Sequence, residues 1–220
     1  MLNSASIIRA VVSLAIVVVS VVLHEVAHAW AAYRLGDDTA KRAGRISLNP
    51  ARHLDPFGSV VLPLLMSLVG GPVFAFAIPV PYNPNNLRKP KRDEVFVALA
   101  GPACNFIQAV VGSLAFRALD AAWTGDLLGY QLLSVVASYV YINLTLMFFN
   151  LIPLPPLDGS SIISPLLDGE ARRTYYRVQR YSMPILLVAL YVLPSVLGFD
   201  PVGQLLYCTA GSAYSFLMGA

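Results

Sequence analysis

The chain has 220 residues, of which 57% are hydrophobic and 12% are charged. Soluble domains carry about 25% charged residues, so this composition argues against a soluble fold and indicates one membrane-embedded domain over residues 1–220. The net charge of +3 is too small to suggest a nucleic-acid partner.

Long apolar segments recur along the chain, and a membrane span needs about 20 mostly apolar residues. Four segments meet this requirement: residues 5–33, 94–118, 130–152 and 182–198. The first is longer than the roughly 7–15 apolar residues of a cleaved signal peptide, so we expect it to be retained. The tail, 201–219, is less apolar, and it either spans the membrane or packs against the other segments.

The segment 58–80 is long and apolar, but a Gly-Gly-Pro sequence at 70–72 interrupts it. The loops on either side of it, 34–56 and 81–93, are both rich in Lys and Arg, which is typical of the cytoplasmic side. A segment between two cytoplasmic loops does not cross once. We therefore expect it to enter the membrane as a helix and to return as an extended strand over 73–80, beside a functional cavity. A single crossing is the alternative.

The same charge rule orients the rest of the chain. Segment 94–118 leads outward, segment 130–152 returns, and the arginine-rich loop 153–181 is again cytoplasmic. The N-terminus is then outside. We predict an all-α polytopic protein of the cell membrane, with about five to six membrane segments.

Residues 24–28 form an H-E-x-x-H motif late in the first span. On a helix, His24 and His28 lie on one face, because residues four apart sit nearly above one another. Zinc accepts such imidazole ligands and keeps one position for water in catalytic sites, and Glu25 is placed to take a proton from that water. A chance match is the alternative, but ionisable side chains inside a span are costly and functional by default. The nearby basic loop places this site toward the cytoplasm.

A catalytic zinc normally has three protein ligands, and the candidates for the third are His53, Asp55, Asp158 and Asp168. Asp168 lies in a highly charged loop, where a solvated turn residue is expected. Asp158 directly follows a span and a proline-rich stretch at 153–156. Those prolines end the helix and stiffen the chain, which favours Asp158 at the level of the two motif histidines.

Three sequence elements together resemble the site-2 protease family. Residues 150–159 are similar to its N-x-x-P-x-P-x-L-D-G signature, and residues 101–105 are similar to its G-P-x-x-N element. Residues 49–58, with Asn-Pro, a histidine and Asp-Pro, resemble a loop of the compact bacterial branch, which has no PDZ or CBS domain. The order and spacing of these elements match across about residues 20–165.

The resemblance implies an intramembrane zinc metalloprotease with a three-helix catalytic core. It implies that His24, His28 and Asp158 bind one zinc ion and that Glu25 activates water. It also implies that Asn150 holds the substrate backbone or the developing oxyanion. The alternative for Asn150 is a hydrogen bond between helices.

Several other residues keep two interpretations. Asn105 either matches a functional family position or joins two helices. His53 either lies near the site entrance or stabilises its own loop. Gly101 and Pro102 are expected to allow close helix packing and to interrupt their helix locally.

The expected reaction is hydrolysis of peptide bonds within or near transmembrane segments of membrane proteins, as in regulated intramembrane proteolysis. The partners are then those segments and the lipid bilayer, and an extended substrate can pair with the return strand. The alternatives are a non-proteolytic membrane metalloprotein, such as a metal transporter, and an inactive scaffold relative. A transporter predicts polar residues along several spans, whereas here they gather at one depth.

Overall fold

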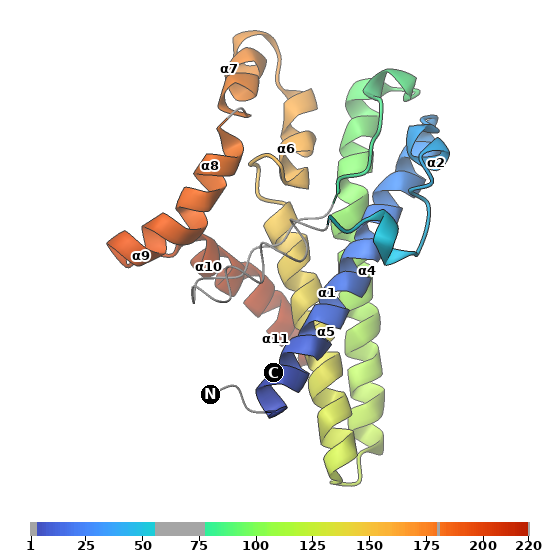
Figure 1. Cartoon of the computed structure of the whole chain (residues 1–220), viewed down its shortest axis with the longest axis vertical. Helices are drawn as coiled ribbons and strands as arrows, with labels where there is room; N and C mark the ends of the chain where they lie inside the picture. The colour runs from blue at the N-terminus through green and yellow to red at the C-terminus, as the bar shows by residue number, and fades with distance from the viewer. Residues whose placement is uncertain (1–3, 56–77, 180, 220) are drawn as a thin grey trace.

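The computed structural model describes residues 4–55, 78–179 and 181–219. Three long helices form its bundle: α1 (Ser4–Leu35), α4 (Pro90–Ala122) and α5 (Leu127–Asn150) (Figure 1). The shorter helices are α2 (Thr39–Arg42), α6 (Asp158–Ile163), α7 (Gly169–Gln179), α8 (Ser182–Leu187), α9 (Leu193–Leu197), α10 (Pro201–Leu206) and α11 (Ser212–Met218), with 3-10 turns at Pro50–Arg52, Pro84–Asn86 and Ser164–Leu166 and π-helical turns at Val188–Val192 and Tyr207–Gly211.

The three long helices are each long and apolar enough to cross a membrane. Their outer faces carry exposed apolar side chains, among them Ile8, Val111 and Leu128, which lipid rather than water is suited to cover. Together with the helical architecture, these faces confirm the expected all-α membrane fold.

The number of membrane segments depends on the C-terminal part of the chain. The helical stretches Pro184–Val196 and Pro201–Met218 meet at 104° and form a fourth span if the pair counts as one broken span. The predicted count of five to six also included the segment 58–80. Residues 56–77 lie outside the described part of the chain, so the re-entrant helix and the return strand stay predictions.

Small and apolar side chains let the three long helices approach one another. Ala29 and Ala32 of α1 are fully buried, and small residues of this kind allow close contact between membrane helices. Ala109 of α4 joins Val140 of α5 and Ala210 of the Tyr207–Gly211 turn in a fully buried apolar cluster. This packing holds α4 against both α1 and α5.

Helix α4 begins at Pro90 and runs without a break through Pro102 to Ala122. Pro90 occupies the first turn, where its missing N–H costs no hydrogen bond, and the Asp93 carboxylate accepts from the Lys89 N–H at 2.8 Å. The local interruption expected at Gly101 and Pro102 is therefore absent from this helix. Packing against α1 and α5 holds the helix together despite the one backbone donor that Pro102 lacks.

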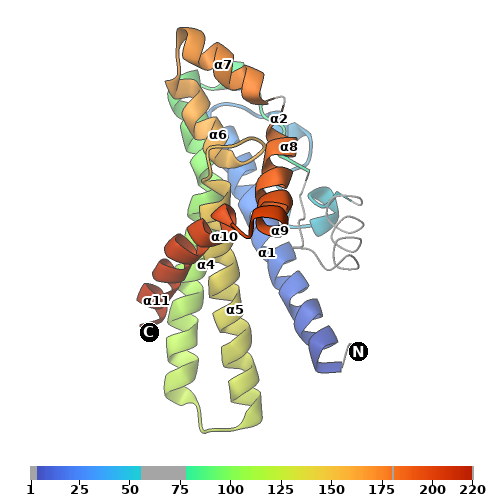
Figure 2. The same cartoon turned by 90° about the vertical axis from the view of Figure 1, so that its left-hand side faces the viewer.

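The shorter helices α2, α6 and α7 lie at the end of the bundle where α1 finishes and α4 begins (Figures 1 and 2). An exposed ion pair between Lys91 Nζ and Asp168 Oδ1, at 2.7 Å, links the start of α4 to the turn before α7. The basic loops after α1 and before α4 thus share one end of the molecule with the arginine-rich helix α7.

Asp37 joins the end of α1 to the segment that precedes α4. Its buried carboxylate accepts hydrogen bonds from the Thr39 N–H at 3.1 Å, the Asn83 N–H at 2.7 Å and the Asn86 amide at 2.9 Å. Burial acts to raise the pKa of Asp37, but the hydrogen bonds outweigh it and hold this pKa below its ordinary value. Asp37 therefore stabilises the fold at neutral pH, and this contribution falls away as the pH drops below the ordinary Asp pKa of about 3.9.

Replacement of Asp37 by Ala is expected to lower the free energy of unfolding by about 1–3 kcal/mol, because three partly buried donors lose a buried acceptor. Unfolding of the purified protein in detergent at pH 7 measures this loss. Asp38→Ala is the matched control, since Asp38 is half exposed and pairs with Arg42 one turn on; such pairs contribute about 0.5 kcal/mol. Equal losses in the two variants would contradict the role assigned to Asp37.

Candidate metal centre

Three side chains meet where α1, α4 and the start of α6 come together. The Nε2 atoms of His24 and His28 lie 3.0 Å apart. Asp158 Oδ2 lies 3.1 Å from the first and 3.3 Å from the second. Among the described residues, these three side chains lie close enough together to bind one metal ion. They are the three ligands predicted from the sequence.

Helix geometry and one glycine bring these residues together. His24 and His28 are four residues apart on α1 and therefore point the same way. Asp158 is the first residue of α6 and folds back toward the end of α5. At Gly159, a Cβ atom would lie 2.3 Å from the Leu151 carbonyl oxygen and 2.5 Å from that of Ile152. The chain can make this return only with glycine after Asp158.

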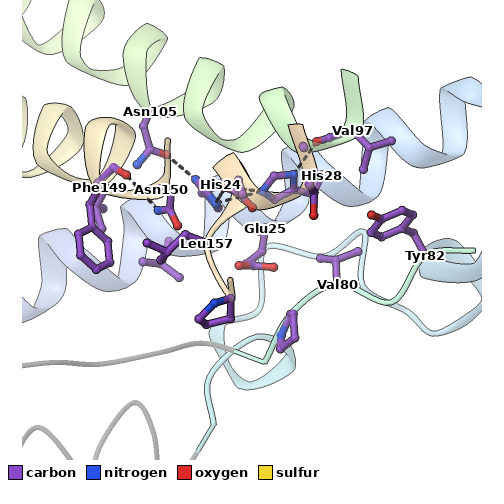
Figure 3. A pocket seen from close by; sticks show the side chains of 17 residues that line it. His24, Glu25, His28, Val80, Tyr82, Val97, Asn105, Phe149, Asn150 and Leu157 are labelled. Carbon is purple, nitrogen blue, oxygen red and sulfur yellow. Dashed lines mark hydrogen bonds and ion pairs between the residues drawn. The ribbon is translucent and has the colours of Figure 1, made fainter. Parts of the chain in front are cut away.

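Each histidine uses its other ring nitrogen to contact α4. His28 Nδ1 donates to the Val97 carbonyl oxygen at 2.7 Å, and His24 Nδ1 lies 3.1 Å from Asn105 Oδ1 (Figure 3). A carbonyl oxygen can only accept, so His28 carries its proton on Nδ1 and turns the lone pair of Nε2 toward His24 and Asp158. The two rings thus face the cluster with the nitrogen that can bind a metal.

The donor set fits zinc. Asp158 Oδ2 is buried and accepts no hydrogen bond from the residues that the structure describes, which is costly for a carboxylate unless a cation lies beside it. Two imidazole nitrogens and a carboxylate oxygen are ligands that zinc prefers, and a catalytic site leaves its remaining position open.

Gly101 of α4 leaves the space that this cluster needs. A Cβ atom at this position would lie 2.3 Å from His28 Nε2 and 2.6 Å from His24 Nε2. From the sequence, Gly101 was expected to allow close packing and to interrupt the helix, and its contact with the ligands was not predicted. The G-P-x-x-N element was the available signal, but it does not say which atoms the glycine faces.

A cavity of about 460 Å³ opens onto the three ligands. Figure 3 shows Glu25 between Asn150 on one side and Tyr82 on the other. Glu25 follows His24 directly and lines the cavity without being one of the three ligands. One amide hydrogen of Asn150 goes to the Leu146 carbonyl oxygen at 2.9 Å, while the side chain also lines the cavity. Its contact with a substrate stays a prediction.

Tyr82 also lines the cavity and was not predicted from the sequence. Its hydroxyl donates to Glu94 Oε1 at 3.2 Å. Burial, with the negative charge of Glu94 adding to it, raises the pKa of Tyr82 to about 12. The phenol is therefore protonated at neutral pH. No sequence pattern marks this tyrosine, because its place depends on how the segment before α4 folds over the cavity.

The other candidate ligands lie elsewhere. His53 is fully buried, and its Nε2 donates to the Ser47 carbonyl oxygen at 2.7 Å. Asp168 is exposed and pairs with Lys91. None of His53, Asp55 and Asp168 lines the described cavity. The loop-stabilising interpretation of His53 fits this position.

Buried polar contacts continue beyond the ligands. Asn143 Nδ2 donates to Ser20 Oγ at 3.0 Å, and the Tyr139 hydroxyl donates to Gln108 Oε1 at 2.7 Å. The expectation that the polar groups gather at one depth is therefore wrong, because Ser20, Asn143, Gln108 and Tyr139 also pair across helices. These four side chains are paired with one another within the bundle, as polar side chains between membrane helices commonly are.

The family model and the individual relatives that match this chain agree with one another. The sequence pattern described as Peptidase family M50 matches residues 12–123 and 117–193. The Bacillus subtilis protein named "Putative zinc metalloprotease YwhC" is 40% identical over 179 residues, which cover 80% of this chain and 78% of that protein.

More distant relatives agree. Rip2 of Mycobacterium tuberculosis, named in the same words, is 32% identical over 184 residues, covering 82% of this chain and 66% of Rip2. Zinc metalloprotease MJ0392 of Methanocaldococcus jannaschii is 28% identical over 152 residues, covering 69% of this chain and 33% of that protein. No solved structure matches the chain significantly.

Proposed function

Because the chain belongs to peptidase family M50 and is a membrane-associated zinc metalloprotease, we propose that it hydrolyses peptide bonds within or near transmembrane segments of other membrane proteins. The observation that carries this proposal is the position of the ligands. His24 and His28 lie inside the apolar helix Ile7–Leu35, and Asp158 follows shortly after the end of Leu127–Asn150. A site built into such helices is within reach of a peptide bond in the bilayer.

The residues of the site have three different roles: metal binding, proton transfer and substrate binding. His24, His28 and Asp158 would hold the zinc ion, which when bound polarises a carbonyl group and makes water easier to deprotonate. Glu25, beside His24 in the cavity, takes the proton from the attacking water and later delivers it to the leaving amine. The remaining amide hydrogen of Asn150 donates to the substrate backbone or to the oxygen on which negative charge develops.

The described end of the segment 58–80 supports the proposed presentation of an extended substrate. Pro79 and Val80 line the cavity and lie in neither helix nor strand. A substrate held in extended form exposes the carbonyl that a helix would keep in its backbone hydrogen bonds. The pairing strand itself, over 73–80, lies mostly outside the described residues and remains part of the proposal.

We further place the protein in the cell membrane with several crossings and with the site toward the cytoplasm. The predicted ligand His28 lies two turns before the end of α1, and the loops rich in Lys and Arg lie at that same end of the bundle (Figure 1). Lys and Arg concentrate in cytoplasmic loops. Water therefore reaches the site from the cytoplasmic side, and cleaved products leave it on that side. Release of cytoplasmic fragments in regulated intramembrane proteolysis is the corresponding biological role.

The test uses the purified full chain in liposomes with its bound metal measured. One substrate carries a candidate cleavage sequence inside a transmembrane segment, and the matched control carries the same sequence in a soluble peptide. We expect zinc-dependent cleavage of the membrane-embedded substrate, with the cut located by mass spectrometry inside or at the edge of the segment. Equal cleavage of the soluble peptide would contradict an intramembrane substrate. Zinc binding with no cleavage of a substrate panel would favour the inactive scaffold.

A further inference from the structure

Asn105 is the polar side chain of α4 that contacts a predicted zinc ligand. It is completely buried, and its Oδ1 lies 3.1 Å from His24 Nδ1. Its Nδ2 has no partner among the residues that the structure describes. Among the described residues, the side-chain amide of Asn105 therefore makes its hydrogen bond with His24.

Protonation chemistry decides what this contact does. A neutral imidazole carries one proton, on Nδ1 or on Nε2. His24 turns Nε2 toward His28 and Asp158, so this nitrogen must keep its lone pair if a metal is to bind there. The proton then lies on Nδ1 and needs an acceptor. Asn105 Oδ1 supplies one, whereas the opposite orientation of the amide would set its hydrogens against the Nδ1 proton.

We propose that Asn105 is a positioning residue that holds His24 in its Nδ1-protonated form, with Nε2 aimed at the zinc position. This inference rests on the zinc site of the proposed function. Partners of this kind fix the tautomer and ring orientation of metal-binding histidines.

The two histidines are held differently. His28 donates to the main-chain carbonyl of Val97, which no side-chain substitution removes. His24 depends on one side chain, Asn105. His24 is therefore the ligand whose orientation a single substitution can release.

The experiment compares the zinc affinity of Asn105→Leu and Asn105→Asp in the purified full chain, by competition with a chromogenic chelator. Leucine has a similar size but no acceptor, so we expect it to weaken zinc binding by about 10–100-fold. Aspartate keeps an acceptor oxygen at the same place, so we expect it to retain the wild-type affinity. A role in packing alone would not separate the two variants in this way.

Asn143→Leu is the matched control. Asn143 is an equally buried amide that contacts α1 at Ser20 and none of the three ligands. We expect this variant to lower the thermal stability of the protein while zinc affinity stays at the wild-type value. A loss of affinity as large as that of Asn105→Leu would overturn the proposal, because it would show a general effect of removing a buried amide.

The wild-type protein provides a test that needs no variant of Asn105. The chain has three histidines, so ¹⁵N-histidine labelling gives a simple spectrum, and His53→Gln removes the signal of the one histidine outside the site. We expect zinc-loaded His24 to show a proton on Nδ1 and none on Nε2. A proton on Nε2 would overturn the proposal.

The results also separate this inference from the proposed function. Wild-type zinc affinity in Asn105→Leu overturns the role of Asn105 and leaves proteolysis standing. Zinc binding with the expected response to the Asn105 variants, but without cleavage of any membrane substrate, supports the role of Asn105 and overturns proteolysis. A wild-type protein that binds no zinc overturns both.

Discussion

Replacing Glu25 by Gln is expected to lower peptide cleavage by about 10²–10⁴-fold, the usual contribution of a general base, while bound zinc stays at the wild-type amount. Glutamine has the shape of glutamate but cannot take a proton from water at neutral pH. Glu25 lines the cavity beside His24 and is not one of the three converging ligands, so zinc binding does not need its charge. Metal analysis and the initial cleavage rate, measured on the same preparation, provide the two readouts.

Asp168→Asn makes the same carboxylate-to-amide change away from the site. Asp168 is exposed, pairs with Lys91 and does not line the cavity, so we expect wild-type cleavage and wild-type zinc. Wild-type cleavage by Glu25→Gln would show that another group takes the proton. Loss of zinc from Glu25→Gln would show that Glu25 also supports the ligands.

The convergence of His24, His28 and Asp158 could be predicted because local geometry determines part of it, while the resemblance to the site-2 protease family supplied the choice of Asp158 over His53 and Asp55. The helical repeat alone places His24 and His28 on one face, and the proline-rich stretch before Asp158 ends the preceding helix at the level of that face. Asp168 could be set aside because its neighbours are charged. Each of these arguments uses only residues near one another in the chain, and the structure agrees with each.

The contributions of α4 could not be predicted in the same way. Gly101 faces the imidazoles, and Asn105 contacts His24, because α4 is rotated to present this side to α1. That rotation depends on packing along both helices, and no pattern within 101–105 encodes it. The continuity of α4 through Pro102 has the same origin, since tertiary packing outweighs the local preference of proline to end a helix.

Substitution of Gly101 by Ala is expected to remove bound zinc and, with it, cleavage. The added Cβ would lie 2.3 Å from His28 Nε2 and 2.6 Å from His24 Nε2, so both imidazoles have to leave their positions. A displacement of about 1 Å at a reacting centre can cost roughly 10²-fold in rate, and here the ligands themselves move. Zinc affinity by chelator competition and the rate on a membrane-embedded substrate measure the effect.

Gly112→Ala separates this effect from a general disturbance of α4. Gly112 is also buried in α4, and its added Cβ would lie 2.9 Å from Val140 Cγ2 and 3.1 Å from Tyr139 Cδ1. Both substitutions gain the same helix propensity, about 1 kcal/mol, and both crowd side chains of a neighbouring helix. They differ in what is crowded: metal ligands at Gly101, and side chains with no metal to bind at Gly112. We therefore expect Gly112→Ala to keep its zinc, and loss of zinc from both variants alike would show that the cavity depends on the whole α4 interface rather than on Gly101.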